Sequence, residues 1–206
     1  DMGQVRIEGL TSTNNLGGNG RGLEVTATGV GASIAGITLE NSTFTGNAAI
    51  GAHLTAGSSA SITTIGISDV TASANASQGL LVQAQSDGDI GTVTIEDTTT
   101  QNNTGANGVG LQVLATGAGS TVTSAILDNI TSSGNANAGI YGAGSTNGVL
   151  GSIEVSNSHA TGGLVQGILF DGVGNGSITT ATVRNSVASG HTGPGVSARG
   201  LPGGDI

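Results

Sequence analysis

Several residue types that shape most folded proteins are missing or rare in this chain. It has no cysteine, no tryptophan and no lysine, and its aromatic residues are Phe44, Tyr141 and Phe170. The absence of cysteine excludes a disulfide scaffold and thiol chemistry. The scarcity of aromatic rings excludes a core built around large side chains, so a core must be narrow and consist of Val, Ile, Leu and Ala.

Basic residues are also scarce. Arg6, Arg21, Arg184 and Arg199 oppose 13 acidic residues, which gives a formal net charge of −9. Nucleic-acid binding depends on clustered Lys and Arg, so we expect no nucleic-acid partner. No apolar run approaches the roughly 18 residues of a membrane-spanning helix, so we expect no membrane span.

Glycine is what the chain has in excess, at 39 of 206 residues. Frequent glycine disfavours helices. A hydrophobic content of 35% and a mean hydropathy of +0.15 nevertheless argue against disorder. The composition therefore favours an ordered fold without long helices.

One segment recurs along the whole chain. The copy VTIEDTTTQNN begins at Val93, and the other copies begin at Val5, Ile37, Ile65, Ala125, Ile153 and Ala181. Successive starts are 32, 28, 28, 32, 28 and 28 residues apart, a spacing typical of solenoid repeats.

Several apolar columns align at once in this register. Two residues after each start lie Ile7, Leu39, Ile67, Ile95, Leu127, Val155 and Val183. Three residues before each start lie Met2, Ile34, Ile62, Ile90, Val122, Leu150 and Ile178. Later in each unit a glycine precedes Leu23, Ala52, Leu80, Leu111, Ile140, Ile168 or Val196. The spacing of two is strand periodicity, so the pattern predicts an all-β, parallel solenoid of about seven coils of 28–32 residues, with three short strands per coil.

Segments such as ITLENSTFTGN (from Ile37), followed by a glycine–apolar step, resemble the right-handed parallel β-helix repeat family. This pectate-lyase-like superfamily includes pectate lyases, phage tailspikes and secreted bacterial adhesins. The resemblance covers essentially the whole chain and implies a right-handed, single-stranded β-helix, one domain over residues 1–206. The family hosts enzymes and structural rods alike, so it does not fix the function.

The residues favour a non-catalytic protein over an enzyme. Lyases of the family use an arginine or lysine beside calcium-binding acids, and none of the four arginines has an acidic cluster beside it in sequence. Hydrolases of the family use paired aspartates. We therefore predict no catalytic residue and no cofactor, with a polysaccharide-lyase-like enzyme as an alternative, and we interpret His53, His159 and His191 as surface side chains.

Stacked acids form the candidate metal site. The repeat places Asp69, Glu96, Asp97 and Asp128 in two adjacent outward columns, within a few ångströms of one another. Like charges at this separation repel unless they are solvated or bridged, and calcium prefers such oxygen ligands. The alternative is a hydrated corner ladder of Asn and Asp.

Two further columns carry polar side chains. A threonine column runs Thr11, Thr43, Thr71, Thr99 and Thr131 before His159 and Val187 break it, and it resembles the face of β-helical ice-binding proteins. Asn15, Asn47, Asn75, Asn103 and Asn135 recur at one position, where stacked amides can hydrogen-bond along the rod.

The two ends of the repeat favour self-association. The tail GGDI resembles the internal DGDI (from Asp87), and the head GQVRIEG continues it as GTVTIED does. Either the chain is a window from a longer repeat protein, or copies stack head to tail into a filament. The predicted polymer interface comprises Met2, Val5, Ile7, Ile178, Val183, Val196 and Ile206.

We therefore expect an extracellular or cell-surface structural protein that forms a filament or part of a long stalk. The alternatives are the stalk of an adhesin with a binding tip elsewhere, with glycans or a host surface as partners, and an ice-binding β-helix.

Overall fold

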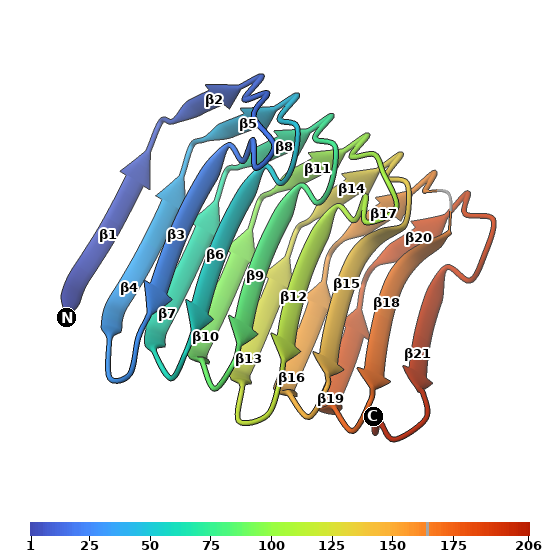
Figure 1. Ribbon diagram of the computed structural model, residues 1–206. Helices are drawn as coiled ribbons and strands as arrows, with labels where there is room; N and C mark the ends of the chain where they lie inside the picture. Colours follow the sequence, from blue (N-terminus) through green and yellow to red (C-terminus); the bar gives the residue numbers. More distant parts are fainter. Residues whose placement is uncertain (164) are drawn as a thin grey trace.

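The computed structural model describes residues 1–163 and 165–206, and within these the chain winds into a stack of parallel β-coils (Figure 1). Three parallel sheets of seven strands each run along the stack, and these residues contain no helix. The predicted class, an all-β solenoid of about seven coils with three strands per coil, is confirmed. The two ends of the described chain lie at opposite ends of the stack (Figure 1).

Each sheet takes one strand from every coil. Sheet A contains β1 (Met2–Glu8), β4 (Ser33–Glu40), β7 (Ser61–Ser68), β10 (Asp89–Glu96), β13 (Thr121–Asp128), β16 (Val149–Ser156) and β19 (Ser177–Arg184). Sheet B contains β2 (Thr11–Thr13), β5 (Thr43–Thr45), β8 (Thr71–Ser73), β11 (Thr99–Gln101), β14 (Thr131–Ser133), β17 (His159–Thr161) and β20 (Val187–Ser189). Sheet C contains β3 (Leu23–Thr28), β6 (Ala52–Gly57), β9 (Leu80–Gln85), β12 (Leu111–Thr116), β15 (Ala138–Ser145), β18 (Gln166–Val173) and β21 (Val196–Gly200).

Each coil pairs residue for residue with the next coil. In sheet A, Ile34 pairs with Met2 on one side and Ile62 on the other. In sheet C, Leu80 pairs with Ala52 and with Leu111. These are the partners that the aligned repeat predicts, so the predicted register is confirmed.

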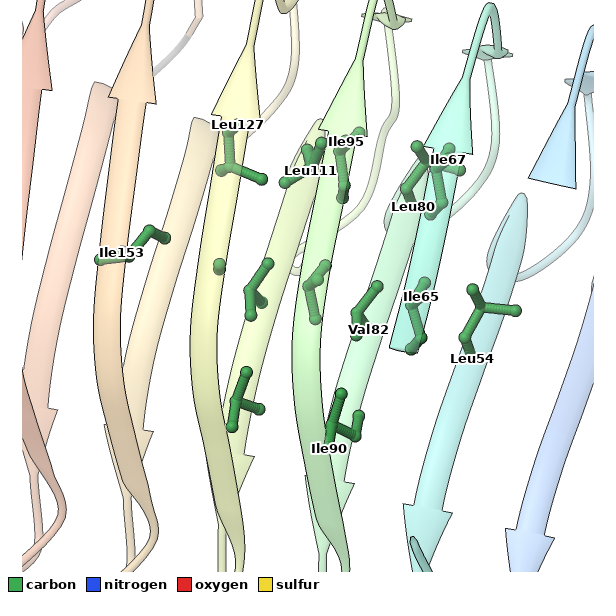
Figure 2. Packing of buried hydrophobic residues seen from close by; sticks show 14 of the residues in the cluster. Leu54, Ile65, Ile67, Leu80, Val82, Ile90, Ile95, Leu111, Leu127 and Ile153 are labelled. Carbon is green, nitrogen blue, oxygen red and sulfur yellow. The ribbon is translucent and has the colours of Figure 1, made fainter. Parts of the chain in front are cut away.

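The core is the narrow space that the three sheets enclose (Figure 2). Ile65 and Ile67 of β7 point into it, as do Leu80 and Val82 of β9, and all are buried. Burying each such aliphatic side chain contributes roughly 1.5–3 kcal/mol. The thin cross-section explains why a chain with three aromatic residues can still build a continuous core.

A glycine column lies where sheet B turns into sheet C. A Cβ atom on Gly79 would lie 2.6 Å from the backbone oxygen of Gly110 and 2.8 Å from Nδ2 of Asn103. Any side chain there would push two coils apart. The recurring glycine is thus a condition for stacking the coils rather than a sign of flexibility.

The corner between sheets A and B uses a left-handed residue in each coil. Asn41 (φ 48°), Asp69 (φ 53°), Asp97 (φ 48°) and Asn129 (φ 52°) occupy it. Asn and Asp tolerate this conformation better than other residues with a Cβ atom. The Asn/Asp column therefore has a backbone role.

The predicted asparagine ladder is present and continuous. Nδ2 of Asn47 donates to Oδ1 of Asn75 at 2.9 Å, and Nδ2 of Asn75 donates to Oδ1 of Asn103 at 3.0 Å. Each Oδ1 also accepts a backbone N–H, for example that of Asn47 onto Asn75 at 3.1 Å. Each Nδ2 reaches a backbone oxygen of the preceding coil, as Asn75 reaches Phe44 at 3.2 Å.

His191 occupies the ladder position in the last coil. Its Nδ1 accepts the backbone N–H of Gly163 at 3.1 Å, and its Nε2 lies 3.0 Å from the backbone oxygen of Ala160. The imidazole thus makes the two backbone contacts that the amides of Asn47, Asn75, Asn103 and Asn135 make in the second to fifth coils, whereas the sixth coil has Gly163 at this position. Interpreting His191 as a stray surface side chain was incomplete, because the ring has this structural role.

Candidate functional site

The outer face of sheet C differs from the outer faces of the other two sheets. His53, Leu81, Gln112 and Leu169 point away from the core, yet only 5–8% of each is exposed. With Tyr141, which lies between Gln112 and Leu169, they form one column across adjacent coils, and the chemistry changes at every step. A repetitive scaffold does not need this variety, so the column is a candidate for a role beyond stability.

The first and fourth coils each carry an inserted loop, at residues 16–22 and 104–110. The loop of the fourth coil builds one wall of this face. Its Val109 is buried against Ala138 and Leu169, and Tyr141 packs beside them. This apolar cluster is separate from the solenoid core. It covers the outer surface of sheet C between β12 and β18.

A polar group adjoins the apolar cluster. Arg199 lies beside Asp171 because β21 pairs with β18 in register. Nε of Arg199 donates to Oδ1 of Asp171 at 2.8 Å, and a second guanidinium nitrogen donates to Oδ2 at 2.7 Å. Sequence reasoning missed this pair, although the 28-residue repeat offset links the two residues.

The protonation states of Tyr141 and Arg199 suit these side chains to binding rather than to proton transfer. Burial, and then the neighbouring Asp171 carboxylate, raise the pKa of Tyr141 to about 12. The hydrogen bond to Asp171 raises the pKa of Arg199 above its ordinary value. Tyr141 therefore keeps its proton at neutral pH and Arg199 keeps its charge, so neither is suited to act as a general base.

These residues surround a depression of about 300 Å³ on the outer face of sheet C. Its lining combines a phenol, amides, an ion pair and aliphatic side chains: Asn137, Ala138, Tyr141, Val165, Gln166, Leu169, Asp171 and Arg199. Such a mixture could hold a ligand that offers both apolar surface and hydroxyl or amide groups.

A second polar group lies at the other end of sheet C. His53 is buried, with Nε2 2.6 Å from Oγ1 of Thr55 and 3.3 Å from Oε1 of Gln83. Nδ1 of His53 has no hydrogen-bond partner among the described residues. Arg21, from the loop inserted in the first coil, forms an ion pair with Glu24 nearby.

The outward direction predicted for His53 is correct, but its interpretation as a surface side chain is wrong. Desolvation, and then the charge of Arg21, lower the pKa of His53 below its ordinary value. His159, by contrast, is exposed on β17, as expected.

The calcium candidates lie on the outer edge of sheet A. Glu96 pairs with Asp128, and Asp97 and Asp69 occupy the left-handed corner of their coils. Asp128 accepts hydrogen bonds from Ser156 at 2.6 Å and Asn157 at 2.7 Å, and these lower its pKa.

The carboxylates of Asp97 and Asp128 thus accept hydrogen bonds from amide and hydroxyl groups. Asn129 donates to Oδ1 of Asp97 at 2.5 Å. In the part of the chain that the structure describes, no three His, Cys, Asp or Glu side chains form a group that could hold a metal ion. Calcium binding by Asp69, Glu96, Asp97 and Asp128 stays a prediction.

The threonine columns lie in register on the outer face of sheet B. Thr43 pairs with Thr11 and Thr71, and Thr131 pairs with His159. A second column lies two residues further on in each coil: Thr13, Thr45, Ser73, Gln101, Ser133, Thr161 and Ser189. In it, Oγ1 of Thr45 and Oγ of Ser73 lie 3.0 Å apart. The two columns form the regular hydroxyl surface that the ice-binding alternative requires, interrupted at Gln101, His159 and Val187.

The predicted polymer-interface residues lie in the first and last coils. Met2 is 59% exposed, Val196 is 50% exposed and Ile206 is 46% exposed. Val5, Ile7 and Val183 are partly buried against the core, and Ile178 is buried. The end faces thus present apolar side chains in line with the internal core columns, with the exception of Ile178, whose N–H already donates to Asp205.

Comparison with protein-family models, curated proteins and solved structures found no match to this chain. The three stacked parallel sheets show that the chain is a β-solenoid. They do not show that it belongs to a particular superfamily. No helix in residues 1–163 and 165–206 has the length and hydropathy needed to cross a membrane.

Proposed function

We propose that this chain is a non-catalytic structural β-solenoid that extends end to end, as a filament of stacked copies or as part of a long surface stalk. The observation that carries the proposal is the unbroken register. Every coil repeats the pairing of the coil before it in all three sheets. A further coil, from a second copy, would meet the same columns at the same spacing of about 4.8 Å.

The step between the third and fourth coils provides the geometric precedent for this junction. There a coil with a short turn stacks on a coil whose turn carries the inserted loop, and β7, β8 and β9 pair fully with β10, β11 and β12. The last coil has the short turn, and the first coil has the inserted loop. Stacking the first coil of one copy on the last coil of another would repeat a step that the molecule already makes.

The energetics also favour this contact. The terminal strands have unpaired main-chain groups along one edge, and strand addition satisfies such groups. Exposed apolar side chains at both ends would be buried at the same time. An interface of this head-to-tail type does not close, so it generates a fibre.

The chemistry of the described residues favours a non-catalytic role. Arg199, the arginine nearest to a depression, has both carboxylate oxygens of Asp171 as partners. Arg6, Arg21 and Arg184 are also ion-paired. None of them is a free base beside a carboxylate cluster.

The fold and its repeat resemble right-handed parallel β-helix proteins of the pectate-lyase-like superfamily, and among them the secreted adhesin rods. We infer an extracellular or cell-surface location from this resemblance. A second candidate function is glycan binding on the outer face of sheet C, as in an adhesin. The depression beside Tyr141, Asp171 and Arg199 favours it, because sugars combine apolar faces with hydroxyl groups.

Negative-stain electron microscopy of the purified chain tests the main proposal. Filaments with the width of one solenoid, lengthening with protein concentration, are expected. Particles of one copy at every concentration would reject the filament of stacked copies. A glycan array with wild-type chain and Y141A tests the second candidate, and thermal hysteresis tests the ice-binding alternative.

A further inference from the structure

All four arginines of the chain lie in its first and last coils. Arg6 and Arg21 belong to the first coil, and Arg184 and Arg199 belong to the last. The five coils between them carry acids without a single arginine or lysine. A net charge of −9 would separate two copies, so this placement concentrates the attractive charges at the two faces where copies would meet.

The outer face of sheet A carries ion pairs in both its first and its last coils. At one end, Arg6 bonds to Glu8 at 3.0 Å and to Glu40 at 2.8 Å. At the other end, Arg184 lies 3.3 Å from Glu154. Glu8 and Arg184 occupy the same column, because Glu8 pairs with Glu40 and Ser156 pairs with Arg184.

Resting on the proposed end-to-end function, we propose that an ionic register defines the junction, with Arg184 of one copy bound to Glu8 of a second copy. One more parallel step beyond β19 places these two side chains directly opposite each other. The series then alternates in sign without a break: Glu154, Arg184, Glu8 of the second copy, Arg6 of the second copy, Glu40 of the second copy.

Sheet C provides a second pair in the same step. Arg199 lies on β21, the last strand of the sheet, and 40% of its side chain is exposed beyond its contact with Asp171. Continuing the register places Glu24 of the second copy opposite Ser197, two positions from Arg199. The carboxylate of Glu24 would then approach a guanidinium from the neighbouring copy.

The C-terminal segment is compatible with this junction. Asp205 forms an isolated parallel bridge with Ser177, and its backbone oxygen accepts the N–H of Ile178. Asp205 and Ile206 thus take the positions that Asp1 and Met2 of an incoming copy would occupy, and an incoming β1 pairs with β19 only from Gln4 onward, opposite Thr180. Glu8 lies within the part that pairs.

Charge reversal tests the inference by sedimentation velocity. R184E places two carboxylates opposite each other at the junction, and E8R places two guanidinium groups there. Each variant alone is therefore expected to associate about tenfold more weakly than wild type. In an equimolar mixture the two variants can alternate along the assembly. One junction then pairs the new glutamate of R184E with the new arginine of E8R, and the next pairs Arg184 with Glu8. Association in the mixture is expected to return to within about threefold of wild type.

E96R is the matched control, because Glu96 lies in the same column of an interior coil and the charge change equals that of E8R. Its association should stay within about threefold of wild type. A circular dichroism spectrum with unchanged β signal shows that each variant is folded.

The outcomes separate the two proposals. If wild type and R184E associate equally well, the ionic register is wrong, but end-to-end assembly is not contradicted. The same holds if association in the mixture of R184E and E8R stays as weak as that of each variant alone. Wild type that remains monomeric up to about 1 mM overturns both the ionic register and the filament of stacked copies.

Discussion

Individual residues divide into two groups according to the column they occupy. Columns that maintain the scaffold repeat one chemistry, as Ile34, Ile62 and Ile90 do in sheet A. The outer column of sheet C changes from His53 to Leu81 to Gln112. Since the scaffold needs no such variety, these residues are the ones to test for roles beyond stability.

His53 makes stability depend on pH. Desolvation, followed by the charge of Arg21, lowers its pKa in the folded chain, whereas the unfolded chain has a histidine pKa of about 6.5. The unfolded state therefore binds more protons below that pH, so the contribution is fully present above about pH 6.5 and is lost as the pH falls. Glu24 acts in the opposite direction but more weakly.

The measurement is the thermal unfolding midpoint at pH 7.5 and pH 5.5. Wild type should lose more stability between these pH values than H53L, in which the side chain matches Leu81 of the next coil. H53L also removes a partner of Thr55, so the difference between the pH values, not the midpoint itself, is the readout. H159T, at an exposed position, should behave like wild type, and an unchanged pH dependence in H53L would reject the role.

The sequence predicts the direction of His53 but not its burial. Ala52 and Leu54, on either side of His53, point into the core, so the strand alternation correctly predicts that His53 points outward. Alternation gives the direction of a side chain but not how far neighbouring side chains cover it. The Arg199–Asp171 pair, in contrast, could have been found by applying the repeat offset to charged residues as well as to apolar ones.

At the scale of elements, the asparagine ladder stabilises the turn between sheets B and C. Each interior asparagine uses its amide nitrogen and oxygen in several buried hydrogen bonds. A buried polar group without a partner costs about 1–3 kcal/mol. Removing one amide leaves partners unsatisfied on both neighbouring coils, so the cost exceeds that of a single hydrogen bond.

N75A should therefore lower the free energy of unfolding by about 2–4 kcal/mol, as measured by urea denaturation. N15A is the matched control, because Asn15 lies at the exposed end of the same ladder and donates to Asn47 and Ser12. Its effect should be under about 1 kcal/mol, since water can replace the lost partners. Equal losses in the two variants would mean that burial of the ladder contributes nothing to its strength.

The strands and turns were predictable because they repeat. A strand in this fold is specified by its two neighbours in the stack, so seven copies of one weak pattern define it better than any copy alone. The inserted loops at 16–22 and 104–110 could be located by the same alignment. The alignment places Val109 and Ala138 at equivalent positions of neighbouring coils, before Gly110 and Gly139. The contact of Val109 with Leu169 could not be predicted, because Leu169 lies in another column two coils away.

At the scale of the whole molecule, long-range and contact electrostatics oppose each other. The net charge of −9 repels an approaching copy over tens of ångströms, whereas the proposed Arg184–Glu8 contact acts only once the faces meet. The coils between the ends carry most of the acids, including Glu96, Asp97 and Asp128. Glu96, Asp97 and Asp128 contribute to repulsion without taking part in the ion pairs of the proposed junction.

Salt should therefore strengthen end-to-end association over the range in which it screens the rods from each other. From about 10 mM to about 150 mM NaCl the Debye length falls from about 30 Å to about 8 Å, so the distant repulsion decreases before the ion pairs in contact are screened. Sedimentation velocity should show larger assemblies of wild type at the higher concentration. The variant E96Q/D97N/D128N, with three fewer negative charges and an intact junction, should assemble at low salt and respond less to added NaCl. A steady weakening of wild-type association from the lowest salt upward would instead mean that the contact pairs outweigh the net charge at every distance.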